Sequence, residues 1–136
     1  MPRTIFVNLP VADLPKAVTL YEAIGFTPNS LFSDETAACL VWSETIQVML
    51  LTHGKWRDFT TRPIPPTTSS EVSLALALDR REEVDAMIEA AAAHGGIADI
   101  NPVQDHSFMY GRDFTDCDGH VWGPFWMDPA AMPQAS

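Results

Sequence analysis

The chain has few basic residues, few cysteines and no long apolar run, and each shortage excludes a class of proteins. Its 136 residues include 8 Lys and Arg against 18 Asp and Glu, which gives a net charge of -10. No basic cluster is present, so neither nucleic acid nor an anionic membrane is expected as a partner. No apolar stretch approaches the roughly 20 residues of a membrane-spanning helix. Cys39 and Cys117 are too few for a disulfide framework.

The N-terminal residues do not resemble a secretory signal, because no cationic segment precedes an apolar run and Pro10 and Asp13 interrupt the one candidate. Together with the low cysteine content, this predicts a cytoplasmic protein. The composition that is present, 46% hydrophobic and 19% charged, is that of an ordinary globular protein. We expect a single domain that spans residues 1–136.

The order strand, helix and three further strands is predicted twice. In the first half, apolar residues alternate along 5–11 and recur at helical spacing along 14–24, between Asp13 as N-cap and Gly25 as the C′ residue. In the second half they alternate along 74–78 and recur along 80–94, where Asp79 is the expected N-cap and Glu82 would complete a capping box. Further strands are expected at 27–32, 37–42, 45–52, 97–103, 107–113 and 120–127.

The sequence therefore predicts an α+β fold built from two βαβββ modules. Module one comprises residues 4–52, module two comprises residues 71–129, and a connector at 53–70 joins them. The connector contains prolines that cannot lie in a central strand, at positions 63, 65 and 66. A connector of this length is often a lid or a binding loop.

The segment 114–127 contains the tight-turn pair Asp118-Gly119, followed by an aromatic-rich strand. Together with the run 9–14 and the pair Gly25-Phe26, it resembles the vicinal oxygen chelate superfamily, which includes glyoxalases, extradiol dioxygenases and bleomycin- or fosfomycin-resistance proteins. Within that superfamily, the chain is most similar to the small bacterial proteins described as predicted lactoylglutathione lyases. The resemblance implies two paired, curled sheets with the active site in their concavity.

The resemblance also implies where a metal would bind. Metal-dependent members hold a divalent ion with four inward side chains, usually His, Gln or Glu, from the first and last strand of each module. Carried over, these positions fall on Phe6, on Met49 (or Gln47 after a two-residue shift), on Ser73 and on Gly123. We therefore expect no metal and no other cofactor, with a divalent metal as the alternative. Asp116, Asp118 and His120 are interpreted as a structural turn rather than as metal ligands.

Several residues are candidates for ligand binding in or near the concavity: Phe6, Asn8, Gln47, Met49, Ser73, Tyr110, Arg112 and Gly123. Asn8 shares a strand face with Phe6 and would either orient a ligand or satisfy backbone groups. Arg112 would either bind an anionic group or form an ordinary surface salt bridge. The small residues Ser73, Ala75 and Ala77 either leave open space or pack against large neighbours such as Phe6 or Trp126. At the start of the connector, a polar and aromatic group forms either a pocket rim or a solvated loop: His53, Trp56, Arg57 and Phe59.

Three functions are consistent with this pattern, and the weakest is a remnant module whose surface now serves assembly. The first is metal-free binding of a small organic ligand, as in the bleomycin-resistance proteins, and the acidic balance would suit a cationic ligand. The alternative is a lactoylglutathione-lyase-like or other metal-dependent lyase or dioxygenase that acts on a small carbonyl or aromatic substrate. The missing ligands favour the first, and since no inward carboxylate is evident, no catalytic residue is assigned. We expect a homodimer, whose modules pair either within one chain or between chains.

Overall fold

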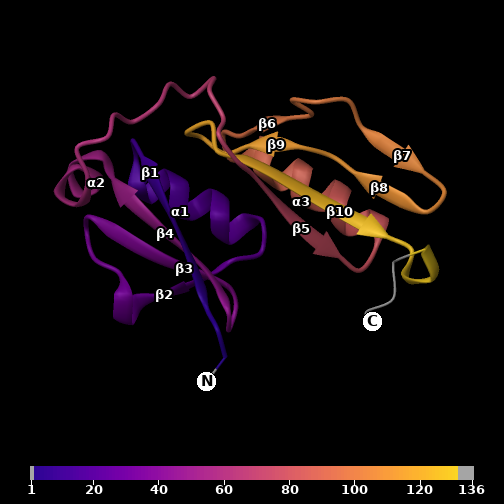
Figure 1. Cartoon of the computed structure of the whole chain (residues 1–136), viewed down its shortest axis with the longest axis horizontal. Helices are drawn as coiled ribbons and strands as arrows, with labels where there is room; N and C mark the ends of the chain where they lie inside the picture. Colours follow the sequence, from indigo (N-terminus) through magenta and orange to yellow (C-terminus); the bar gives the residue numbers. More distant parts are fainter. Residues whose placement is uncertain (1, 132–136) are drawn as a thin grey trace.

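A computed structural model describes residues 2–131 and confirms the α+β fold with two βαβββ modules (Figure 1). Module one contains β1 (Ile5–Val11), α1 (Leu14–Ala23), β2 (Thr27–Asn29), the 3-10 turn η1 (Ser30–Phe32), β3 (Ala37–Ser43) and β4 (Ile46–Thr52). Module two contains β5 (Ser73–Leu78), α3 (Arg81–Ala93), β6 (Ile97–Ala98), β7 (Gln104–His106), β8 (Met109–Gly111), β9 (Phe114–Thr115) and β10 (Val121–Met127), and the 3-10 turn η2 (Pro129–Ala131) follows it. Across residues 2–131, no helix combines the length and apolar character needed to span a membrane.

Each module forms one mixed sheet. In module one the strand order is β1-β4-β3-β2, with β1 parallel to β4 and the other pairs antiparallel. In module two β5 pairs in parallel with β10, which also pairs antiparallel with both β8 and β9. The β8 and β9 residues keep the same register against β10, so they form one strand that is interrupted only at Arg112 and Asp113.

Three local predictions were wrong. The strand expected at 27–32 ends at Asn29, and η1 follows it. The strand expected at 97–103 ends after Ala98, because Asp99 adopts a positive φ of 54° and Pro102 follows. The α3 helix begins one residue later than expected, so Arg80 is its N-cap and no side chain caps it. Asp79 lies outside the helix and forms no capping box with Glu82. The connector contains a helix that was not predicted, α2 (His53–Phe59).

The other helix ends follow the sequence. The Asp13 carboxylate accepts a hydrogen bond from the Lys16 amide at 3.1 Å, as an N-cap does. Gly25 and Gly95, with φ of 117° and 97°, end α1 and α3 in the left-handed conformation that glycine adopts without strain.

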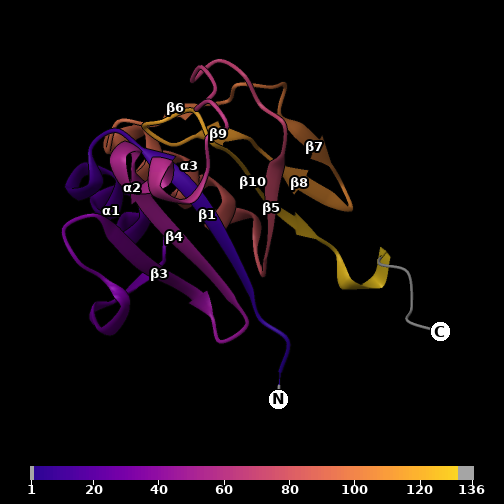
Figure 2. The ribbon, with the colours of Figure 1, turned by 60° about the vertical axis from the view of Figure 1, so that its left-hand side comes forward.

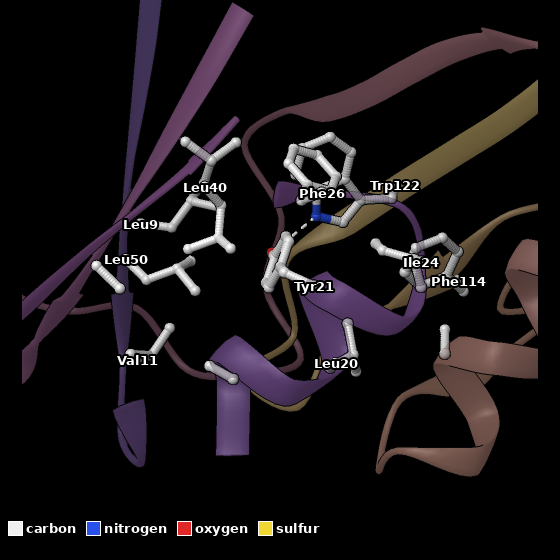
Figure 3. Packing of buried hydrophobic residues seen from close by; sticks show 14 of the residues in the cluster. Leu9, Val11, Leu20, Tyr21, Ile24, Phe26, Leu40, Leu50, Phe114 and Trp122 are labelled. Atoms are coloured by element: carbon white, nitrogen blue, oxygen red, sulfur yellow. Dashed lines mark hydrogen bonds between the residues drawn. The ribbon is translucent and has the colours of Figure 1, made fainter. Parts of the chain in front are cut away.

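One hydrophobic core serves both modules. The helix of each module covers one face of its sheet, and α1 and α3 also contact each other. At the centre, Tyr21 of α1 makes edge-on aromatic contacts with Phe26 (5.4 Å) and with Trp122 of β10 (5.8 Å), as Figure 3 shows. The Trp122 indole donates a hydrogen bond to the Tyr21 hydroxyl at 3.0 Å. Aromatic pairs of this kind contribute about 0.5–1.5 kcal/mol each beyond their area burial, so this cluster binds the modules together.

The turn at 116–120 forms a second junction between the modules. The Asp118 carboxylate accepts a hydrogen bond from the Ala12 amide at 2.8 Å, and a His120 ring nitrogen donates to the Pro10 carbonyl at 2.8 Å. The connector rests on the same turn, since a Cβ at Gly119 would lie 2.0 Å from the Thr67 carbonyl oxygen. In Figures 1 and 2, the connector arches over the end of the molecule where β1 finishes and β5 starts.

This junction holds the two sheets side by side with their helices behind them (Figure 1). The sheet face opposite the helix is exposed along part of each first strand, and we refer to it as the open face. In module one its residues Ala37, Cys39 and Leu51 are buried. Its positions in the first strands include Phe6 and Asn8 of module one and Ser73, Ala75 and Ala77 of module two, all of them exposed.

Candidate functional site

The open face of module one brings four of the sequence candidates together. In the parallel pairing of β1 with β4, Phe6 lies opposite Gln47 and Asn8 lies opposite Met49. Residues on the other parity, such as Leu9 and Leu50, are buried against α1. The four candidates therefore form one continuous patch without charge, in which Phe6 remains 52% exposed.

Two hollows flank this patch. The first, of about 380 Å³, lies between Phe6, Met49 and the η1 turn, whose Leu31 and Phe32 are exposed. The second, of about 450 Å³, lies between Asn8, Leu51 and α2, which contributes Trp56 and Phe59. The sequence placed Trp56 and Phe59 at a possible pocket rim, and both line this hollow.

A larger cavity of about 550 Å³ lies under the connector, between the first strands of the two modules. Its lining includes Asn8 and Trp56 of module one, Leu74 and His120 of module two, and Arg62 and Glu71 of the connector. Asn8 therefore faces both the cavity and the adjacent hollow, while the cavity combines apolar walls with one charge of each sign.

The open face of module two has a floor of small residues. Ser73 and Ala75 of β5 pair with Val121 and Gly123 of β10, and Ser73, Ala75 and Ala77 are exposed rather than packed against large neighbours. Ser73 and Gly123 thus lie on one face, as the sequence indicated, but in the other module from Phe6, Asn8, Gln47 and Met49.

A carboxylate that the sequence analysis missed lies over this floor. Because Phe125 pairs with Gly111 and Trp122 pairs with Phe114, Gly123 lies opposite Asp113. A Cβ at position 123 would lie 2.6 Å from Oδ1 of Asp113. The expectation that no inward carboxylate exists is therefore wrong. Gly111, Asp113 and Thr115 are two residues apart and therefore share one face of the strand. The sequence did not reveal this, because the strand is interrupted at Asp113.

Tyr110 and Arg112 lie on the opposite face, towards α3, and do not join the other candidates. The Tyr110 hydroxyl donates to Asp85 at 2.6 Å, and Arg112 pairs with Asp85 at 2.8 Å and with Asp99 at 2.6 Å. The Tyr110 hydrogen bond lowers the pKa of Asp85, and the Arg112 hydrogen bonds lower the pKa of Asp99. For Arg112, this geometry corresponds to the salt-bridge alternative.

The turn at 116–120 has a structural geometry. Asp116 is buried, and its Oδ1 accepts hydrogen bonds from the Asp118 and His120 amides, both at 2.9 Å. Its Oδ2 accepts the Tyr21 hydroxyl proton at 2.6 Å. Burial raises the pKa of Asp116. Both of its carboxylate oxygens thus have hydrogen-bond partners within the protein, which is the geometry of a structural turn.

The superfamily implies a divalent metal, and the side chains at the corresponding positions do not fit one. Phe6 and Gly123 have no donor atom, and Ser73 lies on a different sheet from Gln47 and Met49. Within residues 2–131, no three His, Cys, Asp or Glu side chains are grouped closely enough to hold a metal ion. The Gln47 amide is instead engaged by the buried Cys39 thiol, at 3.2 Å from Sγ to Oε1.

No family model matches the chain, and neither does any curated protein sequence. Solved structures do match. A hypothetical protein from S. aureus is 25% identical, with a TM-score of 0.77 over 93% of this chain and 94% of that chain. A glyoxalase-related enzyme from Fulvimarina pelagi is 17% identical, with a TM-score of 0.77 over 100% of this chain and 94% of that chain.

The fosfomycin resistance protein FosX from Mesorhizobium loti is 13% identical, with a TM-score of 0.68 over 96% of each chain. A glyoxalase/bleomycin resistance protein/dioxygenase family enzyme from Burkholderia phytofirmans is 16% identical, with a TM-score of 0.74 over 93% of this chain and 99% of that chain. These identities show the fold rather than a shared activity. The chain has the fold of the vicinal oxygen chelate superfamily.

Proposed function

We propose that this chain binds a small organic molecule on the open faces of its sheets, without a metal centre or another cofactor. The observation that carries the proposal is the uncharged patch of Phe6, Asn8, Gln47 and Met49, which is flanked by hollows of about 380 and 450 Å³. Ligand pockets combine apolar walls with a few polar groups that orient the ligand. Here, exposed apolar side chains surround two amides.

A second feature supports binding at this place. The indole Nε1 of Trp56 is buried and has no hydrogen-bond partner among residues 2–131. Buried donors are nearly always paired, so an unpaired one calls for an explanation. Trp56 lines both the cavity and the hollow beside Asn8, and a ligand acceptor reaches its buried Nε1 when the neighbouring side chains move.

A fragment experiment tests the proposal. Neutral aromatic fragments are titrated into ¹⁵N-labelled protein, and we expect amide shifts at Phe6, Asn8, Gln47 and Met49. Asn8→Trp fills the hollow and should abolish these shifts, whereas Ala92→Trp, which adds the same side chain at an exposed position of α3, should leave them unchanged. Shifts that survive Asn8→Trp, or that lie on α3, would contradict the proposal.

We also propose that the protein acts in the cytoplasm as a homodimer in which module one of each chain faces module two of the other, with the ligand between the two faces. Both open faces lie opposite the helices (Figure 1), and part of each is exposed. One carries large exposed residues, among them Leu31 at 86% and Phe32 at 66%, and the other has a floor of small residues. Faces that complement each other in size form an isologous interface when two copies meet about a two-fold axis.

Light scattering after gel filtration measures the assembly. We expect twice the 15.0 kDa chain mass for the native protein, a monomer for Leu31→Asp, and a dimer for the control Ala92→Asp. A native monomer would contradict the dimer and leave the ligand proposal to be judged by the fragment titration.

The alternative function is a lactoylglutathione-lyase-like or other metal-dependent lyase or dioxygenase acting on a small carbonyl or aromatic substrate. One observation favours it, namely the Asp113 carboxylate over Gly123. The donor set described above does not support the metal that such chemistry requires, so we place this alternative second.

A further inference from the structure

We propose that Asp113 is the specificity-determining residue of the open face and selects a ligand with a positively charged nitrogen. This inference rests on the proposed function and names the chemical class of its ligand. Its basis is the position of a single carboxylate oxygen, which is held in place on one side and unobstructed on the other.

The Asp113 carboxylate is fixed by one hydrogen bond. The Asn101 amide donates to Oδ2 at 2.9 Å, and no salt bridge involves Asp113 among residues 2–131. Oδ1 is directed over Gly123 and has no donor partner among those residues. The side chain is half-buried, so its charge is oriented but still accessible.

Gly123 leaves the space that this oxygen occupies. A Cβ at Gly123 would meet no atom within 4 Å other than Oδ1 and the carboxyl carbon of Asp113, so the space above the glycine is otherwise open. Position 123 has no positive φ that would require glycine. The glycine at this position therefore makes room for the Asp113 carboxylate, and the backbone conformation does not require it.

The charge is also isolated on its face. Of the residues that the strand registers place on the two open faces, Asp113 is the only Asp, Glu, Lys or Arg. The nearby carboxylates Asp85, Asp99 and Asp105 lie on the helix side of the sheet, where arginines neutralise them. Of these four carboxylates, Asp113 is the only one that forms no salt bridge among residues 2–131.

An unpaired carboxylate above an uncharged floor favours a cationic donor over a neutral or anionic group. Hydrogen bonds between charged groups are about twice as strong as neutral ones. The net charge of -10 adds a long-range attraction for cations. The ligand class is therefore a small molecule whose ammonium or similar cationic nitrogen lies against Oδ1, with its apolar remainder on the floor formed by Ser73, Ala75 and Ala77.

Three probes of one shape test the inference: benzylamine, which is protonated at neutral pH, benzyl alcohol, which is neutral, and benzoate, which is anionic. Each is titrated into ¹⁵N-labelled protein, and the Gly111 and Gly123 amides, which flank Asp113, report binding. We expect the native protein to bind benzylamine at least about tenfold more tightly than benzyl alcohol, and benzoate least.

Two variants and one control assign the preference to this oxygen. Asp113→Asn should weaken benzylamine about tenfold, to the level of benzyl alcohol, while benzyl alcohol binds as before. Gly123→Ala keeps the charge but displaces the carboxylate, since the new Cβ would lie 2.6 Å from Oδ1, and should weaken benzylamine as well. Glu89→Gln makes the same change in net charge on the exposed side of α3 and should bind all three probes as the native protein does. Native amide dispersion in each variant shows that it is folded.

Every outcome decides the inference. Benzylamine binding that exceeds benzyl alcohol binding, and that both Asp113→Asn and Gly123→Ala reduce, supports it. If benzyl alcohol binds as tightly as benzylamine, or if Asp113→Asn keeps the preference, the inference fails and the proposed ligand site stands. If none of the probes shifts Gly111 or Gly123, the inference fails. If the neutral fragments also produce no shifts on module one, the proposed function fails with it.

Discussion

Asp116 is the one buried acidic residue among residues 2–131, and it lies at the junction of both modules. It accepts hydrogen bonds from the Tyr21 hydroxyl and from the Asp118 and His120 amides. Burial raises the pKa of Asp116, although His120 and Tyr21 act in the opposite direction. Removing charge from water is costly even when hydrogen bonds compensate, so ionisation of Asp116 should weaken folding.

The first prediction concerns the pH dependence of this residue. A carboxyl group whose folded-state pKa is raised contributes most below its unfolded pKa of about 4, and loses that contribution as pH rises through the folded value. We therefore expect the stability of the native protein relative to Asp116→Asn to decrease from pH 4 towards pH 7. Urea unfolding of both proteins at each pH measures this difference, in which carboxylates common to both cancel.

Tyr21→Phe provides the control, because it removes a donor to Asp116 without removing the acid. It should destabilise the protein by about 1–3 kcal/mol at pH 7, where Asp116 most needs its donors. A relative stability that instead increases with pH would show that hydrogen bonding, and not burial, dominates the pKa of Asp116.

At the scale of elements, the interruption between β8 and β9 gives two neighbouring residues opposite tasks. Arg112 extends towards α3 and joins that helix to the Asp99 turn through Asp85 and Asp99. Asp113, the next residue, extends over the open face instead. The same strand thus forms salt bridges on its helix side and presents a carboxylate on its open face.

We predict that Arg112→Ala lowers stability without affecting binding. Loss of the two partly exposed ion pairs should cost about 1 kcal/mol at pH 7. Arg112 lowers the pKa of Asp99 and contributes to lowering that of Asp85, so this stabilisation is present above about pH 4 and lost as pH falls further. Urea unfolding at pH 7 and pH 2.5, compared with the exposed control Arg57→Ala, measures the loss.

The same variant should bind fragments with unchanged affinity, because Arg112 and the open face lie on opposite sides of the sheet. A loss of binding in Arg112→Ala that Arg57→Ala does not share would return Arg112 to the site, where the sequence analysis had placed it.

The elements also show what the sequence could and could not predict. Alternation along β1 and β5 correctly assigned the helix and open faces, because each strand buries every second residue. No apolar pattern marks which face of the 107–113 segment is buried, so the sequence did not show that Tyr110 and Arg112 face α3. The helix α2 was missed because its seven residues have no apolar stripe and include Gly54. To predict that Asp113 lies opposite Gly123, one must know the register of β8 and β9 against β10, and the local sequence does not specify that register.

At the scale of the whole molecule, the fold and the chemistry diverge. The two modules share one core and present two open faces in the arrangement of the superfamily, whereas the side chains on those faces do not supply its metal ligands. The open-face positions of β1, β4, β5 and β10 contain no Lys, Arg or His. A reaction that develops negative charge on oxygen would therefore meet no cationic group there.

This leads to the last prediction, that the protein does not isomerise the hemithioacetal of methylglyoxal and glutathione at an enzymatic rate. The reaction needs a base that removes a carbon-bound proton and an electrophile that stabilises the resulting oxyanions. Asp113 offers a carboxylate, but no electrophile accompanies it. Loss of such stabilisation costs several kcal/mol, on the order of 10³-fold or more in rate. The isolated charge of Asp113 is therefore more suited to binding a cation than to this proton transfer.

Formation of the thioester product is followed with added nickel, with added zinc and with no metal, for the native protein and Asp113→Asn. We expect all of these rates to equal the uncatalysed rate. A turnover number above roughly one per second that Asp113→Asn abolishes would identify Asp113 as the base and establish the enzyme. Turnover that depends on metal but not on Asp113 would instead mean that Gln47 and other donors assemble a centre on binding an ion, and the metal-free proposal would be wrong.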